Sequence, residues 1–176
     1  QGVATAQGLQ QTPSLGFVSH LAQNATGSAP YSLALSFRRG VPELQVNTTL
    51  QGMALDLPAP LGKTADAQQP LRYEQMVARE SLVPVAAGAT PPPLRDQVTL
   101  DLGSIGSATY LRDLAGPQPR VLRGSMGVGL PAGESAPVVA EGVAANIRLG
   151  RVDVDAWERL LSQSTSAPGS AAGGAA

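Results

Sequence analysis

The chain has 176 residues, with 12 basic and 13 acidic side chains, a net charge of −1, no cysteine and only 3% aromatic residues. Its near-neutral charge excludes the basic footprint that nucleic-acid binding needs, and the lack of cysteine excludes disulfides, thiol nucleophiles and cysteine-ligated metals. The 20 glycines and 15 prolines favour many short strands joined by turns over a helical bundle, with a core of leucine, valine and alanine.

Residues 1–30 are small, polar and rich in glycine, glutamine and serine, and they are predicted to form an N-terminal lead with a turn or loop at 24–27. The lead contains the single histidine, His20, so a serine–histidine–aspartate triad would have to use it. No Gly-x-Ser-x-Gly motif is present, and we interpret His20 as a surface residue. The sequence therefore predicts no catalytic residue.

The clearest strand pattern covers residues 31–39, where apolar and polar or small residues alternate with a period of two. A hairpin turn at 40–42 leads into a predicted return strand over 43–50. Alternation places one set of apolar side chains on a common face of these two strands. The residues of that face are Leu33, Leu35, Phe37, Leu44, Val46 and Leu50.

The next segment is predicted to be a strand over 53–57 that ends in a rigid exit. Gly52 shifts the apolar phase from even to odd numbers, which indicates a bulge or bend at that position. Pro58 and Pro60 then end the strand, because neither residue can donate a backbone hydrogen bond to a neighbouring strand. Gly52, Pro58 and Pro60 are therefore assigned structural roles.

Further strands are predicted over 71–80, 97–102, 107–114, 121–130 and 138–149. A loop at 84–95 contains a proline run that should be stiff, and residues 163–176 form a Ser/Ala/Gly-rich tail or linker. Asp153 or Asp155 is expected to cap a short helix that Trp157 anchors to the sheet. Two carboxylates are too few for a calcium or magnesium site, and the glycine motif at 124–129 lacks the lysine of a phosphate loop. No metal or cofactor is predicted.

Together these segments predict a mainly β domain over 31–162. We expect an antiparallel, meandering, curved sheet with one short C-terminal helix. One helix is too small to cover so many strands, so a partly open apolar groove is one interpretation. The other is a closed β-sandwich that acts as a structural or protein-interaction domain.

Two parts of the chain resemble a known family. These are LQGMALDLPAPLGKTA with QQPLRYE, at residues 50–65 and 68–74, and LRGSMGVGLP with GVAANIRLGRVDVDAWERLL, at 122–131 and 142–161. They resemble the AsmA-like family, specifically the YhdP-type periplasmic bridge proteins of Gram-negative bacteria. The chain begins at Gln1 without a methionine or a membrane helix, so the resemblance implies a fragment of such a protein.

The resemblance implies a non-catalytic module whose curled sheet holds phospholipid acyl chains on the apolar face defined above. It implies a periplasmic location in an inner-membrane-anchored protein of the cell envelope, and a part in phospholipid transport and the outer-membrane barrier. Neighbouring segments of the full-length protein would be further partners. No apolar run approaches 18 residues, so no membrane-spanning helix is expected within these 176 residues.

Overall fold

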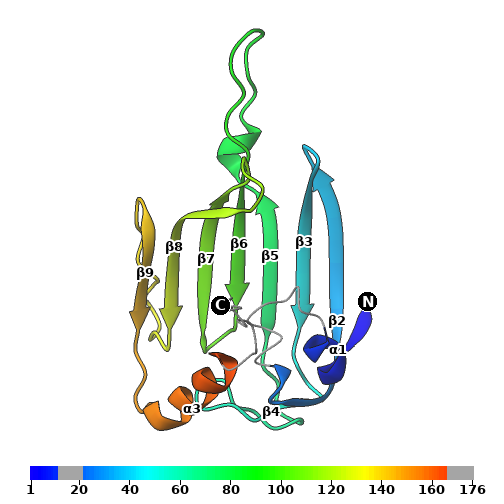
Figure 1. Cartoon of the computed structure of the whole chain (residues 1–176), viewed down its shortest axis with the longest axis vertical. Coiled ribbons are helices and arrows are strands. Elements are labelled where there is room, and N and C mark those ends of the chain that lie inside the picture. The colour runs from blue at the N-terminus through cyan, green and yellow to red at the C-terminus, as the bar shows by residue number, and fades with distance from the viewer. Residues whose placement is uncertain (12–21, 166–176) are drawn as a thin grey trace, which may run out of the picture.

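A computed structural model gives the structure of the chain and describes residues 1–11 and 22–165 (Figure 1). The strands are β1 (Gly2–Thr5), β2 (Ala25–Arg38), β3 (Val41–Thr48), β4 (Met53–Leu55), β5 (Leu71–Val77), β6 (Arg95–Asp101), β7 (Gly106–Asp113), β8 (Arg120–Val128) and β9 (Gly142–Ile147). The helical elements are α1 (Ala6–Gln10), the 3-10 helix η2 (Arg79–Leu82) and α3 (Val154–Thr165).

The nine strands form one sheet in the order β1-β2-β3-β5-β6-β7-β8-β9, with β4 paired to the start of β2. Figure 1 shows this sheet as a single curved layer, with α3 and β4 at one end and a long loop projecting from the other. We call the α3 end the base and the opposite end the arm end. The predicted mainly β fold, with a curved antiparallel meander and a short C-terminal helix, is confirmed.

The predicted boundary after residue 30 is wrong, because β2 begins at Ala25 and runs through it. The segment expected to be a turn at 24–27 is mostly strand and pairs with β4. Small residues let β1 lie beside β2: a Cβ on Gly2 would sit 2.8 Å from the Tyr31 ring. At the other boundary, α3 continues to Thr165, so the tail does not begin at 163. His20 and residues 166–176 lie outside the described residues.

A tight turn, rather than a bulge within one strand, separates β3 from β4. The backbone N–H of Met53 donates to the carbonyl of Leu50 at 3.2 Å, and Gly52 adopts a φ of +96°. A Cβ at Gly52 would lie 2.3 Å from the carbonyl oxygen of Ser28, so this position needs glycine. The turn lets β4 leave β3 and pair with β2, which explains why the apolar phase changes there.

The last pairing of the sheet departs from the antiparallel meander, because β8 and β9 run parallel. Parallel strands cannot be joined by a tight turn, and residues 129–141 form the required crossover. Val138 and Val139 of this crossover line a small cavity of about 100 Å3 together with Leu111 of β7. The strand predicted over 138–149 is shorter than expected, since its first residues belong to the crossover.

Buried apolar packing is concentrated at the base, where α1, β2 and β4 meet (Figure 1). Met53 is 2% exposed and is the largest fully buried side chain among the described residues. Its buried neighbours are small, so this core is limited in volume. The buried cluster consists of Ala6, Ala25, Ala29 and Met53, with Leu9, Leu50 and Leu55 packed against it.

Candidate functional site: an apolar sheet face

The two faces of the sheet differ in polarity along every central strand. Successive side chains of a strand point to opposite faces, and the register aligns like with like across neighbouring strands. On one face, which we call the apolar face, a row runs through Leu33, Val46, Tyr73, Leu100, Ala108 and Met126. On the other face, the polar face, the adjacent row runs through Ala34, Gln45, Glu74, Thr99, Thr109 and Ser125.

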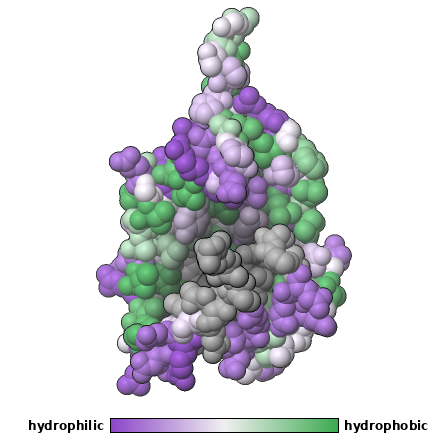
Figure 2. Space-filling model, in the orientation of Figure 1, coloured by the Kyte–Doolittle hydropathy of each residue, from purple (hydrophilic) through white to green (hydrophobic). Residues whose placement is uncertain are grey.

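The apolar face carries most of the residues predicted to form a lipid-binding surface. Leu33 pairs with Val46 and Leu35 pairs with Leu44, so these four residues share one face, as the alternation predicted. Leu33, Leu35 and Phe37 are 47%, 56% and 70% exposed, so no described layer seals them. Figure 2 shows hydrophobic surface along both margins of this face, over β2 on one side and over β8 and β9 on the other.

Leu50 does not belong to this surface, contrary to prediction. It lies beyond the end of β3 with a φ of +52°, and its side chain packs against the buried cluster at the base. The strand predicted over 43–50 is too long at its end, because β3 stops at Thr48, where the turn to β4 begins. Leu50 therefore serves the core and not the apolar face.

At the base the apolar face deepens into a hollow of about 300 Å3. This volume is at the lower end of the range for small-molecule sites, and aliphatic side chains supply nearly all of the lining. The hollow therefore offers burial to apolar groups and few hydrogen-bonding partners. Its apolar lining from the sheet and the segment after β9 consists of Leu100, Leu102, Ile105, Ala108, Met126, Val128, Ile147 and Leu149.

The lower wall of the hollow is built by α3 and by the proline exit after β4. The carboxylate of Asp153 accepts a hydrogen bond from the backbone of Ala156 at 2.9 Å, so its predicted capping role is confirmed. The indole N–H of Trp157 donates to the carbonyl of Ala59 at 3.1 Å. Pro60 and Trp157 both line the hollow. Trp157 thus anchors α3 to the proline exit rather than only to the sheet.

The remaining part of that exit is held by local hydrogen bonds. The N–H of Leu61 donates to the carbonyl of Pro58 at 3.1 Å, and Leu55 and Lys63 exchange two backbone bonds of 2.9 and 3.0 Å. The Lys63 ammonium donates to the carbonyls of Leu50, Met53 and Thr64. Burial lowers the pKa of Lys63, against the opposing effect of Asp66. Pro58 and Lys63 therefore have structural roles.

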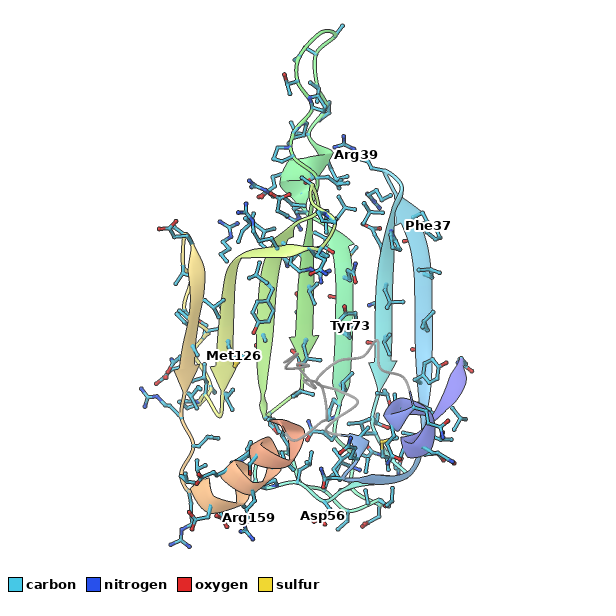
Figure 3. The ribbon with its side chains drawn as sticks, in the orientation of Figure 1. Phe37, Arg39, Asp56, Tyr73, Met126 and Arg159 are labelled. Carbon is cyan, nitrogen blue, oxygen red and sulfur yellow. The ribbon has the colours of Figure 1, made fainter. Side chains whose placement is uncertain are left out.

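Toward the arm end the apolar face contains a polar cluster of Tyr73, Gln75, Asp96 and Arg112. Arg112 forms a two-point ion pair with Asp96, with Nε–Oδ1 and Nη2–Oδ2 distances of 2.9 and 2.6 Å. Asp96 is fully buried, whereas the Arg112 side chain is 24% exposed. The Tyr73 hydroxyl donates to Gln75 Oε1 at 3.3 Å. This cluster, of which Tyr73 is labelled in Figure 3, interrupts the apolar rows and sets a limit to the purely apolar part of the face.

Burial raises the pKa of the Tyr73 phenol above its ordinary value of 10.0, with Arg112 opposing and Asp96 reinforcing the shift. We therefore expect one tyrosine absorbance transition above pH 10 that disappears in Tyr73→Phe. Because the folded-state pKa is the higher one, stability should fall as pH rises from about 10 through that value. Ultraviolet titration of both proteins checks this. A transition that persists unchanged in Tyr73→Phe would contradict the assignment.

Sequence reasoning missed both the hollow and the polar cluster. The alternation in β6 placed Val98, Leu100 and Leu102 on one face, but it carried no information on which residues of β8 and β9 lie beside them. The partnership of Asp96 with Arg112 likewise depends on the β6–β7 register, in which the two residues face each other. Arg112 lies in the strand predicted over 107–114, but Asp96 lies just before the strand predicted over 97–102, so the predicted elements did not pair them.

Other features of the described residues offer less. A larger depression of about 680 Å3 beside β1 is shallow and partly polar, with Ser32 and Asn47 in its lining.

Within residues 1–11 and 22–165, no set of three histidine, aspartate or glutamate side chains is placed to hold a metal ion. In the same part of the chain, no helix has the length and apolar character to cross a membrane. Comparisons with models of protein families, with curated proteins and with solved structures found no match.

Proposed function

We propose that this chain is a non-catalytic β-groove module that holds phospholipid acyl chains against its apolar face. In this proposal it forms part of a YhdP-like periplasmic bridge, where it contributes to phospholipid transport between membranes and to the outer-membrane barrier. The observation that carries the proposal is the exposed apolar face, whose paired rows continue from β2 to β9 beside an apolar hollow.

The dimensions of the face suit a lipid chain. The rows cross seven strands at a spacing of about 4.8 Å, so each row is roughly 30 Å long, while one leaflet of a bilayer core is about 15 Å thick. Neighbouring rows are about 7 Å apart, which leaves a furrow for an extended hydrocarbon chain. Each buried methylene would contribute about 0.8 kcal/mol. Headgroups would then remain at the open margin of the face.

The alternative, a closed β-sandwich with a structural or protein-interaction role, needs a second sheet packed on the apolar face. All strands of the described residues belong to one sheet, and Leu35 and Phe37 are more than half exposed. In a sheet of this size, exposure of the apolar face to water is unfavourable and raises the free energy of the folded chain. We therefore favour an occupant for that face over a self-contained sandwich.

The proposal is tested by mass spectrometry of lipids that co-purify with the chain from bacterial membranes. We expect phospholipid at close to one molecule per chain, and about tenfold less in Leu35→Asp, because a charge replaces an apolar contact. Ala34→Asp is the matched control: Ala34 is the exposed neighbour of Leu35 on the opposite face, and this variant should keep its lipid.

Both variants should retain the far-UV circular dichroism of the parent, because neither side chain is buried. A parent chain without bound phospholipid would contradict the proposal and favour the structural alternative. Equal lipid loss in the two variants would also contradict it, because the loss would then not depend on the apolar face.

A further inference from the structure

A charge-free loop projects from the sheet at the arm end, between η2 and β6 (Figure 1). This loop, residues 83–94, is called the arm. No charged residue occurs from position 81 to 94, and the sequence of the arm is VPVAAGATPPPL. Val83 and Val85 have apolar side chains, yet they are 57% and 41% exposed. A backbone hydrogen bond from Ala89 to Ala86 at 3.0 Å closes the turn at its tip.

The two legs of the arm are fixed at their base by one side chain. Ser81 is fully buried, its hydroxyl donates to the carbonyl of Pro93 at 2.8 Å, and the backbone N–H of Arg95 donates back to it at 2.9 Å. The three consecutive prolines restrict the backbone of the returning leg. The arm is therefore a directed projection whose base is tied to the sheet.

Three arginines surround the base of the arm, and we call them the basic collar. The Arg39 guanidinium donates to the carbonyl of Ser81, Arg79 is exposed on η2, and Arg95 pairs with Glu80 at 2.8 Å (Figure 3). Glu80 is the single carboxylate among these four residues, so positive charge predominates. A charge-free arm next to three arginines complements a phospholipid surface, where phosphates lie above hydrocarbon.

We propose that the arm docks this chain onto an anionic phospholipid bilayer. Val83 and Val85 enter the interface between headgroups and acyl chains, while the basic collar lies at the level of the phosphates. This contact does not require the apolar face to hold lipid, so it goes beyond the groove function. It brings the arm end of the apolar face to the membrane, with the base directed away from it.

Co-sedimentation with vesicles of equal parts phosphatidylglycerol and phosphatidylcholine tests the proposal. We expect the chain to bind these vesicles, and Val83→Asp/Val85→Asp to bind about tenfold more weakly or less, because the leg of the arm nearest the basic collar then carries negative charge. Val138→Asp is the matched control, since Val138 is a valine that is 98% exposed and belongs to the crossover between β8 and β9, not to the arm. This variant should bind like the parent.

The basic collar is tested separately with Arg79→Gln, which should weaken binding to the same vesicles about fivefold in low salt. Arg151→Gln, at an exposed position of the base, is its control. Parent binding should also decrease as salt rises from about 0.05 to 0.5 M. A parent chain that does not bind the vesicles, or an arm variant that binds as tightly as the parent, overturns the proposal and leaves a protein partner for the arm.

The same assay separates this proposal from the groove function. Leu35→Asp should bind vesicles normally while it loses co-purified phospholipid, and the arm variant should show the reverse. Thermal unfolding of each variant confirms that the substituted chain is folded before it is compared, and the exposure of Val83 and Val85 predicts little change in its midpoint. A parent chain that binds vesicles but carries no co-purified phospholipid would count against the groove function alone.

Discussion

Arg112→Met is expected to destabilise the fold by about 3 kcal/mol or more. Asp96 is fully buried, and Arg112 supplies both hydrogen bonds of the ion pair at 2.9 and 2.6 Å. The carboxylate would be left buried without a cationic partner, which costs more than the pair contributes when intact. Urea denaturation followed by circular dichroism measures the change in the free energy of unfolding.

Arg120→Met provides the matched control for this experiment. Arg120 also pairs with an aspartate across neighbouring strands, but at 3.7 Å and with 76% of its side chain exposed, so its loss should change stability by about 0.5 kcal/mol or less. The double variant Asp96→Asn/Arg112→Met should recover part of the lost stability, because it removes the buried charge. Equal effects of the two arginine substitutions would show that the Asp96–Arg112 pair is not buried as described.

Met53→Ala is expected to lower the free energy of unfolding by about 3 kcal/mol. Met53 fills the centre of the small base core, and its buried neighbours Ala6, Ala25 and Ala29 have no longer side chains that could refill the cavity. Thermal unfolding should show a midpoint about 10 °C lower, given the usual relation between stability and midpoint for a chain of this size.

Met76→Ala is the control for that substitution, because Met76 is 46% exposed on β5 and loses little contact when truncated. Its midpoint should differ from that of the parent by only about 1–2 °C. If the two methionine variants were equally stable, the base core would not be the main source of cooperative packing, and the apolar face would have to be buried instead.

The sequence predicted the strands well because their faces differ so clearly in polarity. Alternation located the central strands to within a few residues, as in β3, expected at 43–50 and found at Val41–Thr48. The start of β2 was missed for a physical reason. Its buried residues there are Ala25 and Ala29, whose small side chains give no apolar signal. Pattern reasoning detects large side chains, and this core is built mostly from small ones.

The candidate site was only partly predictable for a different reason. Leu33, Leu35, Leu44 and Val46 belong to one hairpin, so a short turn fixes their pairing. The hollow instead combines β6–β9 with α3 and the proline exit, elements that are up to about a hundred positions apart along the chain. Contacts of that kind depend on strand order and on the direction of β9, which leave no trace in the local pattern.

The parallel pairing of β8 and β9 decides which end of the sheet is closed. Gly142 of β9 lies opposite Arg123 and Ile147 opposite Val128, so the chain leaves β9 beside the end of β8. An antiparallel β9 would have released the chain at the far end, and Trp157 could not then meet Ala59. The direction of β9 therefore places α3 and the proline exit against the base of the apolar face, where they wall the hollow, and ties the last helix of the chain to a segment about a hundred positions earlier.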